Sequence, residues 1–129
     1  MKRPHLYRVI LPVADIERAT AFYAAVLGWP GQRVSPGRHY FDCGGTILAC
    51  YDPVADGDGE RGDWRFHPFQ YIYLAVPELE ATLTRVQAAG GTIDHGIETM
   101  PWGERMFHAR DPLGSLISFV DEQTLFRGK

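Results

Sequence analysis

The five histidines and two cysteines of this 129-residue chain are the first residues to test for acid–base, nucleophilic or metal chemistry. No two histidines stand three or four residues apart, so His5, His39, His67, His95 and His108 predict no metal site on one helix face. Cys43 and Cys50 form no C-x-x-C pair and have no histidine at a spacing that indicates a nucleophile and its base. We interpret both cysteines as reduced thiols of a cytoplasmic protein.

An acidic run is the second candidate for chemistry. Residues 52–66 read DPVADGDGERGDWRF, in which Asp56, Asp58 and Glu60 alternate as in a calcium-binding loop. Arg61 stands where such a loop needs a glycine, so we interpret the run as a solvated linker.

Composition excludes several classes of partner. The formal net charge is −3 and the sequence pI is about 5.9, so there is no basic footprint for a nucleic acid. No apolar run reaches the roughly 20 residues of a membrane span, and the N-terminal residues lack the pattern of a signal peptide. We therefore expect a cytoplasmic protein with no nucleic-acid or membrane partner.

The first half of the chain predicts one strand, one helix and three further strands. The helix begins after the N-cap Asp15, carries apolar residues at helical spacing and ends at Gly28. The expected strands are Leu6–Val13, Arg33–Ser35, Arg38–Asp42 and Thr46–Tyr51, separated by Pro-Gly and Gly-Gly turns.

The second half repeats this order. A strand is expected at Phe69–Val76, a helix at Glu78–Ala89, and strands at Thr92–Ile97, Arg105–Arg110 and Ser115–Val120. Asp15-Ile16-Glu17 matches Glu78-Leu79-Glu80, and the pattern H-x-x-D-x-x-G occurs at both His39 and His108. We predict one α+β domain made of two paired β-α-β-β-β modules, which form a curved sheet around a cleft. The modules span about 5–52 and 67–121, with a linker at 53–66 and a tail at 122–129.

Two motifs resemble a known family. The early run DIERATAFYAAVLGW and the late run WGERMFHARDPLGSLISF resemble the vicinal-oxygen-chelate superfamily, which includes glyoxalase I, bleomycin-resistance proteins and extradiol dioxygenases. The resemblance covers nearly the whole chain. It implies the two-module fold, a small-molecule ligand in the cleft and a homodimer.

The resemblance also implies where a divalent metal would be bound. Four side chains, typically His and Glu, hold the ion in the metal-dependent members. The matching positions here are Arg8, Ala49, Tyr71 and Ser118. Arginine stays protonated, alanine has no donor atom, and serine and tyrosine are weak ligands. We therefore expect no metal and no other cofactor.

Strand parity predicts which side chains share a face with those four positions. We assume two-residue turns that pair Asp42 with Gly45 and Asp111 with Gly114, which turns His39 and His108 to the opposite face. The expected ligand-binding residues are then Arg8, Arg38, Tyr40, Tyr51, Tyr71, Tyr73, Arg105, Phe107 and Ser118, with Trp102 as a lid. Three guanidinium groups among phenols, with no carboxylate, favour a small anionic or aromatic ligand. Each residue also has a structural interpretation; Arg8, for example, would keep an exposed strand edge from aggregating.

Three function classes remain open from the sequence. The first is a metal-independent small-molecule-binding protein of the bleomycin-resistance type. The second is a diverged enzyme of the glyoxalase or dioxygenase type, a lyase or an oxidoreductase with a non-standard or metal-free site. The third is an accessory domain that kept the fold without a ligand.

Overall fold

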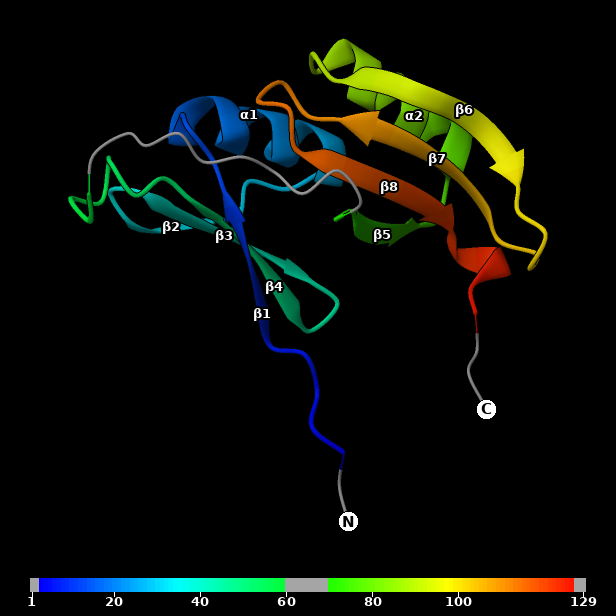
Figure 1. Cartoon of the computed structure of the whole chain (residues 1–129), viewed down its shortest axis with the longest axis horizontal. Helices are drawn as coiled ribbons and strands as arrows, with labels where there is room; N and C mark the ends of the chain where they lie inside the picture. Colours follow the sequence, from blue (N-terminus) through cyan, green and yellow to red (C-terminus); the bar gives the residue numbers. More distant parts are fainter. Residues whose placement is uncertain (1–2, 60–69, 127–129) are drawn as a thin grey trace. The chain divides into compact units, whose positions relative to one another are not determined.

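The computed structural model describes residues 3–59 and 70–126, and it has the expected α+β order of two β-α-β-β-β modules (Figure 1). Each module forms its own compact unit, divided near residue 63. The first contains β1 (Arg8–Pro12), α1 (Ile16–Leu27), β2 (Gln32–Ser35), β3 (Arg38–Cys43) and β4 (Thr46–Tyr51). The second contains β5 (Ile72–Val76), α2 (Leu79–Ala88), β6 (Thr92–Thr99), β7 (Arg105–Arg110) and β8 (Leu116–Asp121), followed by a 3₁₀ turn at Glu122–Thr124.

The first module is a four-stranded mixed sheet with one helix on one face. The strand order is β1-β4-β3-β2, with β1 parallel to β4 and the other neighbours antiparallel. Helix α1 packs against β3 and β4. Its apolar side chains meet the helix-facing side chains of the sheet in a core that includes Phe22, Tyr23, Val26, Phe41, Leu48 and Cys50. The opposite face of this sheet, which α1 does not cover, is called the open face below.

The second module repeats the topology with the order β5-β8-β7-β6, β5 being parallel to β8. Helix α2 packs against β6, β7 and β8. Its core includes Leu79, Val86, Phe107, Ile117 and Phe119. Neither of the two described helices is long and apolar enough to cross a membrane.

The helix ends follow the expected signals in the first module more closely than in the second. The Asp15 side chain accepts hydrogen bonds from the backbone N–H groups of Glu17 and Arg18, which caps α1. Gly28 then ends α1 in the left-handed region at φ 81°, where a glycine carries no steric penalty. Glu78 occupies the matching N-cap of α2 but makes no side-chain capping bond.

The two β-hairpins that follow the same sequence pattern have different registers. In β3–β4 the turn is the two residues Gly44-Gly45, and Tyr40 rather than Arg38 lies opposite Ala49. Because the register differs from the predicted one by an even number of residues, each side chain still lies on the face that we predicted for it. In β7–β8, Arg110 pairs with Leu116 across a five-residue connection, so the predicted pairing of Asp111 with Gly114 is wrong. The register of this hairpin differs from the predicted one by an odd number of residues, so each side chain lies on the face opposite to the predicted one. His108, not Phe107, lies opposite Ser118.

The turn at 111–115 explains the reversal. Asp111 Oδ1 accepts hydrogen bonds from the N–H groups of Leu113 and Ser115, both at 2.9 Å, and the Asp111 N–H donates to the Ser115 carbonyl at 3.0 Å. Asp111 thus closes a loop wider than a two-residue turn, and β8 begins only at Leu116.

Some expected boundaries differ from the structure. Strand β5 begins at Ile72, and Phe69, where we expected its start, lies outside the described residues. Residues 53–59 of the expected linker form consecutive turns whose N–H groups bond back to Asp52, Pro53 and Val54. The remaining linker residues, 60–66, lie outside the described residues.

Candidate functional site

Arg8 lies on the open face of the first sheet, on the edge strand β1. It is exposed, and its guanidinium carbon lies 5.3 Å from the centre of the Tyr40 ring and 4.9 Å from that of Tyr7. In the parallel pairing of β1 with β4, Arg8 lies beside Ile47 and Ile10 lies beside Ala49. Arg8 is therefore on the same side of the sheet as Ala49. Among the described residues Arg8 contacts aromatic rings and no carboxylate. Arg8 is therefore an exposed cation that lies against two aromatic rings.

Arg38 shares this open face, but carboxylates already surround it. Its Nε lies 3.6 Å from Asp56 Oδ2 and one terminal nitrogen lies 3.9 Å from Asp58 Oδ2, while its guanidinium covers the Tyr51 ring at 4.4 Å. The Tyr51 hydroxyl donates to Asp58, and this hydrogen bond is the main cause of the raised pKa of Tyr51. The expectation that this face carries no carboxylate is therefore wrong.

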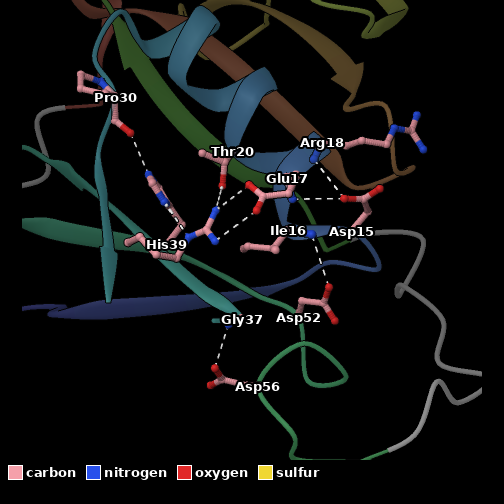
Figure 2. A network of polar contacts seen from close by, with 11 residues as sticks. Asp15, Ile16, Glu17, Arg18, Thr20, Pro30, Gly37, His39, Asp52 and Asp56 are labelled. Carbon is pink, nitrogen blue, oxygen red and sulfur yellow. Dashed lines mark hydrogen bonds and ion pairs between the residues drawn. The ribbon is translucent and has the colours of Figure 1, made fainter. Parts of the chain in front are cut away.

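The segment that supplies these carboxylates is anchored under the start of α1. Buried Asp52 accepts hydrogen bonds from the N–H groups of Ile16 at 3.3 Å and Ala55 at 3.1 Å. Asp56 accepts from the N–H of Gly37 at 2.8 Å, as Figure 2 shows. A Cβ at position 37 would lie 2.2 Å from the Asp52 carbonyl oxygen, so only glycine fits there. The close approach of Gly37 holds the acidic residues beside Arg38.

The helix-facing side of the first sheet holds a separate polar network. His39 lies there, as expected, with Nε2 at 2.7 Å from the Pro30 carbonyl and Nδ1 accepting from Arg33 Nε at 3.2 Å. The Arg33 guanidinium also donates to Glu17 on α1 at 2.9 Å and thereby lowers the pKa of that carboxyl. These groups tie β2 and β3 to α1 and lie away from the open face.

Arg105 and Phe107 also lie on a helix-facing side, that of the second sheet. Arg105 pairs with Glu80 on α2 and with Asp121 at 3.4 Å, and the bond from Arg105 is the main cause of the lowered pKa of Glu80. Phe107 is fully buried and stacks on Phe119 at 5.0 Å. The five-residue connection therefore removes both from the expected ligand-binding face, where we placed them by assuming a two-residue turn.

The same register places His108 on the face of the second sheet that α2 does not cover, called the open face of that sheet. Its Nδ1 lies 2.5 Å from Ser118 Oγ, and its ring centre lies 5.0 Å from Tyr71, 6.3 Å from Tyr73 and 5.9 Å from His95. Burial of the ring, followed by the nearby His95, lowers the pKa of His108. Sequence reasoning placed His108 on the wrong face, and the signal it missed is Asp111, whose side chain accepts from the N–H groups of Leu113 and Ser115 and so closes the wider turn.

Trp102, the expected lid residue, is two-thirds exposed at 66%. Its indole N–H donates to Glu104 at 2.8 Å within the loop between β6 and β7. Tyr71 and Tyr73 are close neighbours, with ring centres 6.2 Å apart, and Tyr73 is exposed.

The chain is similar to a known protein family and to several solved structures. The family model described as the Glyoxalase/Bleomycin resistance protein/Dioxygenase superfamily matches residues 5–119. The chain belongs to this superfamily. Members of the superfamily bind small molecules. No functionally curated protein matches the chain.

Several solved structures share this fold at low sequence identity. A glyoxalase-related enzyme from Fulvimarina pelagi is 20% identical with a TM-score of 0.76, and the match covers 91% of this chain and 87% of that one. A lactoylglutathione lyase from Agrobacterium tumefaciens is 20% identical with a TM-score of 0.71, covering 95% and 96%. An integron cassette protein from V. cholerae is 26% identical with a TM-score of 0.66, covering 94% and 97%.

The resemblance implies metal positions at Arg8, Ala49, Tyr71 and Ser118, and side chains of these types are poor donors for a divalent ion. Arg8 is a cation, Ala49 has no donor atom, and Ser118 is fully buried with its hydroxyl engaged by His108. Within residues 3–59 and 70–126, no group of three or more His, Cys, Asp or Glu side chains could hold a metal ion.

Proposed function

We propose that this superfamily member binds a small, partly aromatic anion without a metal ion, and that Arg8 contacts the anionic group. The observation that carries the proposal is the contrast between Arg8 and the other arginines of the described sheets. Arg33, Arg38, Arg105 and Arg110 each have a carboxylate within ion-pair distance. Arg8 has none among the described residues.

The aromatic contacts of Arg8 favour this role. A guanidinium that lies over an aromatic ring uses its flat face for the ring, and its N–H groups project outward from its edges. Tyr40 and Tyr7 therefore orient the planar fork while leaving its hydrogen bonds for a ligand. A carboxylate or phosphate can accept two parallel bonds from such a fork. The same tyrosine rings offer apolar surface to an aromatic part of the ligand.

Arg38 is a weaker candidate for the same role. An incoming anion would have to displace Asp56 and Asp58, both of which lie within 4.0 Å of the guanidinium. Repulsion between these carboxylates and the ligand adds to that cost. We therefore assign the anion to Arg8 and a structural role to Arg38.

A thermal-shift screen of aromatic carboxylates and phosphates tests the proposal on the parent protein, Arg8→Ala and Arg8→Lys. Binding raises the melting temperature in proportion to affinity and concentration. We expect shifts with the parent, a partial shift with Arg8→Lys, which lacks the two-pronged contact, and little shift with Arg8→Ala. Equal responses of the parent and Arg8→Ala to every anion would show that Arg8 is only a surface charge.

A further inference from the structure

His39 is bonded through both ring nitrogens, and its two partners fix where its proton lies. Its Nε2 lies 2.7 Å from the carbonyl oxygen of Pro30, as Figure 2 shows, and its Nδ1 lies 3.2 Å from Nε of Arg33. A carbonyl oxygen can only accept a hydrogen bond, and an arginine Nε–H can only donate one. The proton of His39 is therefore on Nε2, and Nδ1 offers its lone pair to Arg33. This pair of bonds requires a neutral imidazole.

The groups that face this ring come from three elements. Arg33 lies on β2, Glu17 lies on α1, and Cys50 lies opposite His39 on β4. The Glu17 carboxylate would attract a protonated ring, but both of its oxygens already accept from Arg33, at 2.9 and 3.4 Å. A proton added to Nδ1 would therefore set an N–H of His39 against an N–H of Arg33 and bring two positive charges together.

Burial makes this conflict hard to relieve in place. His39 is 7% exposed, and its ring lies 5.0 Å from the buried ring of Phe41. A buried N–H that has no acceptor is costly, and little water reaches this ring to supply one. A protonated His39 can therefore be accommodated only when the Arg33 guanidinium moves away from Nδ1.

Arg33 is the residue through which β2 is joined to its neighbours. β2 is a four-residue edge strand, and its backbone pairs with β3 in a register that shifts next to Arg33. Besides bonding to His39 and Glu17, the Arg33 guanidinium lies 3.5 Å from the hydroxyl of Thr20 on α1. Movement of this side chain therefore weakens the attachment of β2 to both β3 and α1.

The turn after β2 is anchored by different groups. The Gly37 carbonyl accepts from the Asp52 N–H at 2.7 Å, and the Gly37 N–H donates to Asp56 at 2.8 Å. None of these groups bonds to His39 or Arg33. Loosening that starts at Arg33 is therefore confined to β2 and does not extend to β3 and β4.

We propose that His39 and Arg33 form a proton-sensitive fastening of the edge strand β2: their bond holds β2 in place at neutral pH, and protonation of His39 breaks the bond and loosens the strand. The repeat-related His108 differs, because its Nδ1 lies beside the hydroxyl of Ser118 rather than a cation. The proposal does not depend on Arg8, which lies on β1 at the opposite edge of the first sheet.

The first measurement is the position of the proton on the His39 ring. Long-range proton–nitrogen correlation NMR distinguishes the two neutral tautomers. At about pH 7.5, above the ordinary histidine range, we expect a protonated Nε2 and an unprotonated Nδ1. A proton on Nδ1 at this pH would overturn the proposal, because Nδ1 could then not accept from Arg33.

The second measurement is amide hydrogen exchange of β2 at about pH 7.5 and about pH 5.5, corrected for the intrinsic dependence of exchange on pH. The opened strand takes up the proton more readily than the closed one, so opening becomes easier as the pH falls. We expect protection of β2 to fall about 10-fold relative to that of the central strand β4, since a hydrogen bond from a charged group is lost. Glu17 stays ionised over this range, because Arg33 lowers its pKa from an ordinary value of 4.5.

Two variants assign the response to His39. In His39→Asn the amide oxygen replaces Nδ1 as the acceptor for Arg33 and does not titrate, so protection of β2 should be the same at both pH values. His5→Gln, which changes an exposed histidine outside the sheets, should keep the parent response. Unchanged protection of β2 in the parent, or an equal acid response in His39→Asn, would overturn the proposal.

Discussion

His108 on β7 lies directly opposite Ser118 on β8, and their side chains are joined across the two strands at 2.5 Å. The same register sets Phe107 against Phe119 on the other face, where their rings stack. The turn closed by Asp111 fixes both pairs because it determines how many residues separate β7 from β8. One carboxylate therefore helps decide which side chains enter the core of the second module and which face outward.

The first prediction concerns Phe107 as a core residue. Phe107→Ala should reduce the free energy of unfolding by about 3–5 kcal/mol, because it leaves a cavity against Phe119. Tyr73→Ala, which removes an exposed ring from the opposite face, should cost about 0.5 kcal/mol or less. Urea unfolding of the two variants measures both effects. A near-neutral Phe107→Ala would contradict the register.

The second prediction compares the two helix N-termini. Asp15→Ala should destabilise the protein by about 1 kcal/mol, since two backbone N–H groups of α1 lose their acceptor. Glu78→Ala at the matching position of α2 removes no capping bond and should be close to neutral. Chemical denaturation of both variants in parallel checks this difference. Equal losses would show that the capping bond of Asp15 contributes nothing measurable.

The third prediction concerns the pH dependence of stability. The pKa of His108 is lowered by burial and by His95, against the opposing effect of Glu98 and Asp94 on β6, and Tyr71 and Tyr73 face the same ring. The unfolded chain therefore takes up a proton at a higher pH than the folded chain. The free energy of unfolding should fall as the pH drops below about 6.5, the ordinary histidine value, and His108 should add no slope above it.

Guanidinium unfolding between about pH 5.5 and 7.5 checks this slope in the parent and in the double variant His108→Phe, Ser118→Ala. The double variant should have the shallower slope, because it lacks the group that resists protonation. Identical slopes would show that His108 titrates alike in the folded and unfolded states.

The fourth prediction concerns metal. The protein should purify without a stoichiometric divalent ion, and a chelator should leave its melting temperature unchanged. The reason is the donor chemistry of Arg8, Ala49, Tyr71 and Ser118, which suits no divalent ion. Elemental analysis of the purified protein gives the answer. About one zinc, nickel or iron per chain, removable by chelator with a fall in melting temperature, would refute metal independence.

The elements of this fold could be predicted from the sequence because their signals are local. Asp15, the apolar period that follows it and Gly28 mark α1 without reference to any other part of the chain. The Gly44-Gly45 turn likewise gave the correct faces for β3 and β4, although the exact pairs differ. Arg8 and Tyr40 were therefore expected on the same face, as they are.

The errors come from contacts that local patterns do not contain. The late D-P-L-G-S run permits either a two-residue turn or the wider Asp111 loop, and one residue of difference reverses a strand's faces. Because the protein forms the wider loop, Arg105 lies on the helix-facing side, where it pairs with Glu80. For the same reason, His108 lies on the open face of the second sheet. We did not predict the carboxylates beside Arg38, because their segment has the sequence of a solvated linker. The contacts of Asp52 and Gly37 that anchor this segment are not visible in the local sequence.

Calorimetric titration with benzoate and phenyl phosphate tests the central claim, that Arg8 binds an anion, most directly. The parent is compared with Arg8→Gln and with Arg33→Gln, which removes the same charge from the helix-facing side of the same sheet. We predict that Arg33→Gln binds like the parent and that Arg8→Gln binds at least about fivefold more weakly, the loss expected for an accessible charge-assisted contact. Equal dissociation constants for all three proteins, or equal losses in both variants, would contradict the account.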